Sequence, residues 1–165
     1  MLKAIIFDMD GVIIDSEPAH ARAALSVFSS HGINVDTGYC NSFIGSSTKN
    51  MCEDAIKRFG IDITTSALLN EMNKAKSDIV KKEGYIIIDG VQELVKKLYK
   101  AGYKLAVASS SSPVEIEDTV KALGIRKYFN KLVSSSNVKN PKPAPDTFEL
   151  ALSKLGVSAK ETIVI

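Results

Sequence analysis

The feature that most constrains this chain is an apolar run near its N-terminus that ends at two acids and a glycine. Residues 4–7 (AIIF) lead directly to Asp8, and Asp10 and Gly11 follow. An apolar run that breaks at a glycine is typical of a buried strand entering a turn. Side chains alternate along a strand, so the two carboxylates tend to point to the same side. Because open α/β sheets bind ligands beyond the carboxyl ends of their strands, we expect a functional site here.

These residues by themselves are compatible with three interpretations. Residues 8–11 (DMDG) form a plain turn after a strand, or a site for a divalent cation, or a nucleophile beside a proton carrier. Gly11 supplies the positive φ that a sharp exit from the strand needs. Residues elsewhere in the chain are needed to decide between these interpretations.

Composition restricts the class of partner. The 165 residues are 45% hydrophobic and 24% charged, with a net charge of +2, which suits one core and a small second unit. No block of basic residues suggests a nucleic-acid or membrane partner, and no apolar stretch approaches the about 18 residues of a membrane span. Cys40 and Cys52 are too few and too far apart for a zinc or redox motif. We expect a cytoplasmic monomer that acts on small molecules.

Hydrophobic periodicity divides the chain into a helical part and an alternating part. Four helices are expected at residues 17–31, 37–43, 47–59 and 66–82. After residue 85, strands at 103–108, 128–134 and 162–165 alternate with helices at 91–101, 113–123 and 144–155. This predicts an α/β fold with a parallel, Rossmann-like core (1–14 and 86–165). A helical cap (15–85) interrupts it after the first strand, as a lid that closes over a ligand.

Two further strand ends carry polar groups. Ser109–Ser112 lie between a strand and a helix, where hydroxyls and free helix N–H groups favour a phosphate, although such a run also suits a plain helix N-cap. Lys142 lies between Pro141 and Pro143, which stiffen the backbone that presents its charge. Asp146 is expected to begin the next helix as a cap or first-turn acid. Together with the acid pair, these groups predict a magnesium-assisted phosphoryl-transfer site.

The chain resembles the haloacid dehalogenase superfamily. The resemblance spans essentially the whole sequence and rests on residues 7–12 (FDMDGV), 106–111 (AVASSS) and 142–146 (KPAPD). Residues 15–18 (DSEP) and the helical insert resemble the branch of β-phosphoglucomutases and sugar phosphatases. The resemblance implies an enzyme that acts on a small phosphorylated metabolite.

The resemblance also implies roles for individual residues. Asp8 would be the nucleophile that forms an aspartyl phosphate, and Asp10 the general acid and base. The cofactor would be Mg²⁺, held by the Asp8 carboxylate and the backbone carbonyl of Asp10. Ser109 and Lys142 would bind the phosphoryl group, and the substrate-binding set would comprise Glu17, His20, Thr48, Lys49, Ser110 and Ser111. Glu17 and His20 share a face of the first cap helix, and an ordinary surface acid and half-buried histidine remain alternatives.

The sequence is compatible with two reactions of a sugar phosphate. One is hydrolysis, and the other is a mutase reaction that moves the phosphoryl group to another hydroxyl. Mutases of this branch have a basic residue and an amide after the serine cradle, where this chain has Ser112 and Pro113, so we favour a phosphatase. Members of the superfamily continue past the last apolar strand into a loop whose acids complete the metal site. This chain stops at Ile165, so we expect a truncated chain with weak magnesium binding and little turnover. A non-catalytic phosphate-binding module is the third alternative.

Overall fold

A computed structural model describes all residues from 1 to 165. The chain divides into two compact units. The first, which we call the core unit, comprises Met1–Asp15 and Tyr85–Ile165, and the second, the helical unit, comprises Ser16–Gly84. The boundaries expected from the sequence lie one residue from these. Each unit has its own hydrophobic core.

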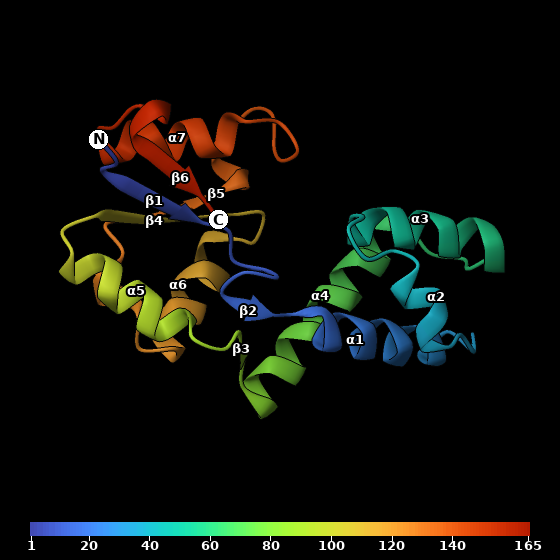
Figure 1. Cartoon of the computed structure of the whole chain (residues 1–165). Helices are drawn as coiled ribbons and strands as arrows, with labels where there is room; N and C mark the ends of the chain where they lie inside the picture. The colour runs from blue at the N-terminus through green and yellow to red at the C-terminus, as the bar shows by residue number, and fades with distance from the viewer. The chain divides into compact units, whose positions relative to one another are not determined.

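The core unit is built on a four-stranded sheet with the strand order β5-β4-β1-β6 (Figure 1). All three strand pairs are parallel, and Ile5 pairs with Leu105 on one side and with Ile163 on the other. The prediction of a parallel α/β sheet is therefore confirmed. The strands are β1 (Ala4–Phe7), β4 (Lys104–Ser109), β5 (Lys131–Ser134) and β6 (Thr162–Val164).

Alternation along the strands produces two buried faces of the sheet. Ile5 and Phe7 belong to the cluster on the side of α5 and α6, whereas Ala4 and Ile6 belong to the cluster on the side of α7 (Figure 1). A strand buried on both faces needs apolar residues at every position, which explains the uninterrupted run in the sequence. The helices are α5 (Val91–Lys100), α6 (Pro113–Ala122) and α7 (Asp146–Leu155). Short 3₁₀ turns occupy Arg126–Tyr128, Ser135–Asn137 and Ala159–Glu161.

Two short strands lie outside the parallel sheet. β2 (Ile14–Asp15) pairs antiparallel with β3 (Ile86–Ile87), with Ile14 opposite Ile87. The apolar residues around 86–88 are therefore not part of the parallel sheet. They form a ribbon with the segment that leaves the first strand. The chain thus enters and leaves the helical insert through a hydrogen-bonded pair of segments.

The helical unit contains four helices, and local signals set their ends. Ser47 and Thr64 cap α3 and α4 by accepting hydrogen bonds from Asn50 N (3.1 Å) and Ala67 N (3.2 Å). Gly60 ends α3 in the left-handed conformation, with φ of 66°. The helices are α1 (Glu17–Ser30), α2 (Thr37–Asn41), α3 (Thr48–Phe59) and α4 (Thr65–Glu83).

An apolar cluster from all four helices forms the interior of the helical unit. Phe28 and Leu68 are fully buried, and Cys52 lies among them with its sulfur 3.7 Å from that of Met72. Burial is the main cause that raises the pKa of the Cys52 thiol to about 11, so this cysteine stays protonated and unreactive at neutral pH. Both cysteines are free thiols.

None of the helices combines the length and the apolar character that crossing a bilayer requires.

Candidate active site

Asp8 is the first residue after β1, and the backbone fixes its carboxylate. The amide of Met9 donates to Asp8 Oδ1 (2.7 Å), while the amide of Asp8 itself donates to the carbonyl of Ile165 (2.8 Å). The side chain remains 37% exposed. A carboxylate that is oriented by its backbone and open to solvent is suited to bind a cation or to attack a ligand.

Asp10 lies in the tight turn that follows β1. The carbonyl of Met9 accepts hydrogen bonds from the amides of Ile13 (2.8 Å) and Ile14 (3.1 Å), and Gly11 has a φ of 75°. This positive φ is strained for any residue with a Cβ, which explains the glycine. Asp10 Oδ2 lies 3.5 Å from the hydroxyl of Ser111, so the turn brings the second acid to the end of β4.

The serine run after β4 divides into a buried anchor and a helix cap. Ser109, the last residue of β4, is fully buried, and its hydroxyl oxygen accepts a hydrogen bond from the amide of Ser111 (3.0 Å). That interaction leaves the hydroxyl hydrogen of Ser109 available to donate to a ligand oxygen. Ser112 and Glu115 form a reciprocal capping box at α6, with distances of 3.0 and 3.3 Å. Ser112 is therefore the cap, and Ser109, Ser110 and Ser111 are the candidate cradle.

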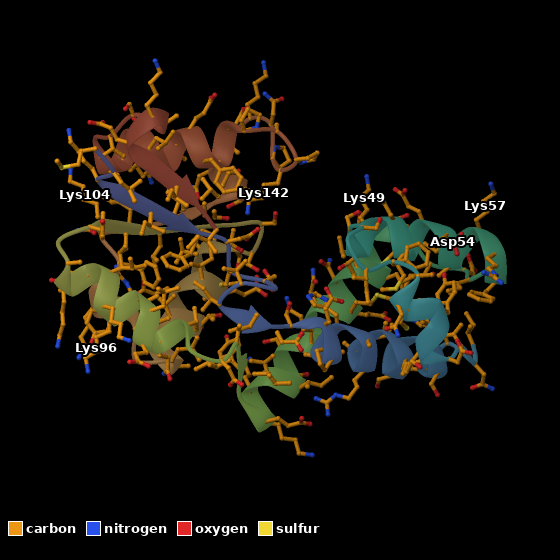
Figure 2. All side chains as sticks on the ribbon, in the orientation of Figure 1. Lys49, Asp54, Lys57, Lys96, Lys104 and Lys142 are labelled. Atoms are coloured by element: carbon orange, nitrogen blue, oxygen red, sulfur yellow. The ribbon has the colours of Figure 1, made fainter.

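Lys142 brings a positive charge to Asp8 from the loop between β5 and α7 (labelled in Figure 2). Its Nζ donates to Asp8 Oδ2 (2.8 Å) and to the carbonyl of Ala108 (2.8 Å). Asp146 accepts hydrogen bonds from the amide and the side chain of Asn140, at 3.2 and 3.0 Å, and so ties down the loop that carries the lysine. Asp146 is the first residue of α7, as the sequence predicted.

Ser134 is a residue of this site that sequence reasoning missed. It ends β5, is 2% exposed, and donates from its hydroxyl to the carbonyl of Ser111 (2.6 Å). Because one hydroxyl has one hydrogen, the hydroxyl of Ser136 must be the donor in its contact with Ser134 Oγ (2.9 Å). Ser134 thereby holds the loop that contacts Asp10. Its only sequence signal was a second serine run at a strand end.

The remaining sequence-predicted residues lie in the helical unit. Glu17 and His20 belong to the first turn of α1, and Thr48 and Lys49 begin α3. Lys49 forms an ion pair with Glu53 (3.4 Å) along the helix surface. Their contact with a substrate stays a prediction.

The oxygen donors at the end of β1 fit a magnesium ion. Mg²⁺ prefers oxygen ligands and is commonly held by one or two carboxylates together with water and substrate phosphate oxygens. Asp8 supplies a carboxylate, and Asp10 follows two residues later with a carboxylate and a backbone carbonyl. No group of three or more His, Cys, Asp or Glu side chains is placed to hold a metal ion. Asp8 and Asp10 are the residues that would hold one.

The sequence profile of one protein family matches nearly the entire chain. It is the haloacid dehalogenase-like hydrolase family, and the match covers residues 5–165. This chain is a haloacid dehalogenase-like hydrolase. The resemblance inferred from the three motifs is thus confirmed, and with it the prediction that the protein belongs to a family of enzymes.

Individual relatives of the chain are named as phosphatases. Fructose-1-phosphate phosphatase YqaB of Escherichia coli (strain K12) is 32% identical over 164 residues, which are 97% of this chain and 84% of that protein. A phosphorylated carbohydrates phosphatase of Thermotoga maritima is 27% identical over 167 residues, 99% of this chain and 75% of that protein.

A solved structure extends the likeness to the fold. The crystal structure of a Thermotoga maritima protein described as a β-phosphoglucomutase superposes with a TM-score of 0.81 at 26% identity. The alignment covers 99% of this chain and 75% of that chain. The haloacid dehalogenase-like fold is therefore shared along the whole length of this sequence.

Proposed function

We propose that this chain hydrolyses phosphate monoesters of small sugars through an aspartyl phosphate on Asp8. The observation that supports this most is the convergence of Lys142 on the carboxylate of Asp8 at 2.8 Å, from a loop that follows a different strand. The relatives named above act on phosphorylated carbohydrates, which supports the same substrate class.

The proposed first step is attack of an Asp8 carboxylate oxygen on the phosphorus atom. The ester oxygen of the sugar leaves and takes a proton from Asp10, so the sugar departs as an alcohol. In the second step Asp10 removes a proton from a water molecule, whose oxygen attacks the aspartyl phosphate. Inorganic phosphate leaves and the Asp8 carboxylate is restored. The contact of Asp10 with Ser111 keeps the second acid at the strand ends, where both steps occur.

Negative charge on the phosphoryl oxygens is the main obstacle to attack by Asp8, because it repels the carboxylate. Lys142 and the hydroxyl of Ser109 would bind the phosphoryl oxygens, and the Ser110 amide, at the exposed tip of the same cradle, would add a third donor. The Asp8 carboxylate and the Asp10 carbonyl would hold Mg²⁺, which supplies further neutralisation of the phosphate charge when bound.

The N-terminus of α6 favours hydrolysis over a mutase reaction. A mutase has to hold a second phosphate while the sugar turns over, and the residues after the cradle are the natural place for such donors. Here the amide of Ser112 donates to the Glu115 carboxylate, the hydroxyl oxygen of Ser112 accepts from the Glu115 amide, and Pro113 has no N–H. Neither backbone position therefore offers a free N–H to a distal phosphate. With these two amide donors missing, we favour water as the acceptor of the phosphoryl group.

We propose that the helical unit acts as a cap that contributes to substrate choice. Thr48 and Lys49 at the start of α3, and Glu17 and His20 in α1, are its candidate contacts. A cap of this kind would exclude water from the phosphoryl group until the sugar is bound.

The decisive experiment traps the covalent intermediate with Asp10→Asn. Asn can neither protonate the sugar oxygen nor activate water, so turnover should fall about 10²- to 10⁴-fold. The variant should still accumulate a phosphoryl group on Asp8 after incubation with a sugar phosphate and Mg²⁺, measured by mass spectrometry of the intact chain. Asp8→Asn is the control and should acquire none. Wild-type turnover by Asp10→Asn would refute this role of Asp10.

A substrate panel separates the three remaining outcomes. Phosphate release is measured for a series of sugar phosphates that includes fructose 1-phosphate, and conversion of glucose 1-phosphate to glucose 6-phosphate is followed in parallel. Release of inorganic phosphate supports hydrolysis. Isomerisation without release supports a mutase instead, and phosphate binding with neither reaction supports a non-catalytic module.

A further inference from the structure

Lys142 has a third neighbour besides Asp8 and Ala108. Its Nζ lies 4.6 Å from the centre of the Phe148 ring, well within the about 6 Å over which a cation is attracted to an aromatic face. We propose that Phe148 is the positioning residue of Lys142 and sets its capacity to bind the phosphoryl group. This inference rests on the proposed function of the lysine. It adds a residue that none of the three motifs contains.

The ring is fixed by the helix that carries it. Phe148 is the third residue of α7, and its amide donates to the carbonyl of Pro145 (2.9 Å). Its side chain is partly buried and packs against the apolar cluster between α7 and the sheet, which includes Ala108. The ring and the carbonyl acceptor of the lysine therefore belong to one rigid assembly.

The three neighbours determine how many N–H groups of the Lys142 ammonium remain for a ligand. Two N–H groups of Lys142 are used by the Ala108 carbonyl and by Asp8, which leaves one N–H for a phosphoryl oxygen. The side chain is only 16% exposed, so the ammonium has lost much of its hydration. The face of the ring attracts the ammonium and so compensates for the lost hydration, and it takes up no N–H group. A carboxylate at the same place would neutralise the lysine and compete with the phosphate.

A purely structural role for Phe148 would make different predictions. In that case the ring is only apolar volume, and leucine would serve as well as an aromatic residue. Under the proposal, tyrosine preserves the function because it retains an aromatic face, and leucine does not. The test therefore compares Phe148→Leu with Phe148→Tyr in the full chain. Leu152→Val is the packing control, since Leu152 packs against the same cluster and has no aromatic ring.

The first measurement needs no turnover. In a chain labelled with ¹³C-lysine, the ε-methylene protons of Lys142 should be shifted upfield by the ring current of Phe148. The shift should persist in Phe148→Tyr and Leu152→Val and disappear in Phe148→Leu. Lys142→Arg assigns the signal. An unchanged signal in Phe148→Leu would overturn the proposal, because the ring would then not lie over the ammonium.

The second measurement is the affinity for inorganic phosphate in the presence of Mg²⁺, by titration calorimetry. Phe148→Leu should raise Kd about 5- to 20-fold, and Phe148→Tyr and Leu152→Val should stay within about twofold of wild type. Equal weakening by Leu152→Val would overturn the proposal in favour of packing. If wild type binds phosphate and Phe148→Leu binds it equally, the inference fails while the proposed function stands. If wild type and Lys142→Ala bind phosphate equally, the assigned role of the lysine fails as well.

Discussion

The two units of this molecule differ in how they treat buried polar groups. Fully or nearly buried hydroxyl side chains are concentrated in the core unit, at Ser109, Thr119, Ser134, Ser135 and Thr147, whereas the helical unit has one, Ser16. Burying a hydroxyl is unfavourable unless it is hydrogen-bonded, and each of the five in the core unit has a partner. These bonds tie the loops after the strands together.

The helical unit is held in another way. Its interior is an apolar cluster, and its ion pairs His31–Glu71 (2.7 Å) and Arg22–Glu83 (2.7 Å) lie toward the surface. Apolar packing tolerates substitution on the surface, whereas a hydrogen-bonded site needs particular atoms at particular distances. Changes in the core unit should therefore affect chemistry more than stability, and changes inside the helical unit should do the reverse.

The largest effect expected in the core unit is that of Asp8→Asn. The amide is nearly isosteric but cannot act as a nucleophile, so kcat should fall by at least about 10⁴-fold. The melting temperature should change little, because the carboxylate is partly exposed and its neighbours are backbone groups and Lys142. Phosphate release and thermal unfolding are measured on the same preparation. A large loss of stability would remove the distinction between the two units.

The corresponding test of the helical unit is Phe28→Ala. Phe28 is fully buried and stacks edge-on against Tyr39, with ring centres 5.8 Å apart. Truncation should lower the free energy of unfolding by about 3–5 kcal/mol, measured by urea denaturation. Phosphorylation of Asp8 by a small phosphate donor should persist wherever the core unit stays folded. If Phe28→Ala abolished phosphorylation without unfolding, the helical unit would have a direct part in the chemistry.

Ser134→Ala tests whether the buried hydroxyl network serves the site. The change leaves the carbonyl of Ser111 without its partner, so the loop that contacts Asp10 should lose its fixed position. We expect kcat/KM to fall about 10-fold, the equivalent of one buried hydrogen bond. Ser136→Ala is the matched control, because it removes the exposed donor and keeps the bond to Ser111. Equal effects of the two variants would contradict a special role for Ser134.

The smallest effect concerns a partly exposed carboxylate of the core unit. A hydrogen bond from the Lys3 side chain, assisted by the amide and hydroxyl of Ser158, lowers the pKa of Glu161 from 4.5 to about 2. Between these values the unfolded chain binds more protons than the folded chain, so stability should decrease as the pH falls from about 4.5 to 2. Glu161→Gln should flatten this part of the pH profile, measured as melting temperature. An identical acid slope in the variant would disprove the assignment.

Much of the fold and the centre of the site could be predicted from the sequence. The buried strand at 4–7, the starts of α1 and α6 next to Pro18 and Pro113, and the ends of α3 and α7 before Gly60 and Gly156 follow from signals within a few residues. Asp8, Ser109 and Lys142 were placed at the same edge because the carboxyl ends of parallel strands meet there. His31 was expected only to end α1, but its ring also reaches Glu71 on α4.

What the tertiary structure decided depends on groups that are far apart in the sequence. Asp8-Met9-Asp10-Gly11 specified the acids, but only the fold shows that Lys142 donates to the carbonyl of Ala108, 34 residues earlier, and that Ser134 holds Ser111, 23 residues earlier. The ribbon of Ile14 with Ile87 and the ring of Phe148 over the lysine are of the same kind. Periodicity and capping operate over a few residues. A hydrogen bond or cation–π contact, by contrast, requires two distant segments to meet within a few ångströms, and only packing of the whole core unit determines that.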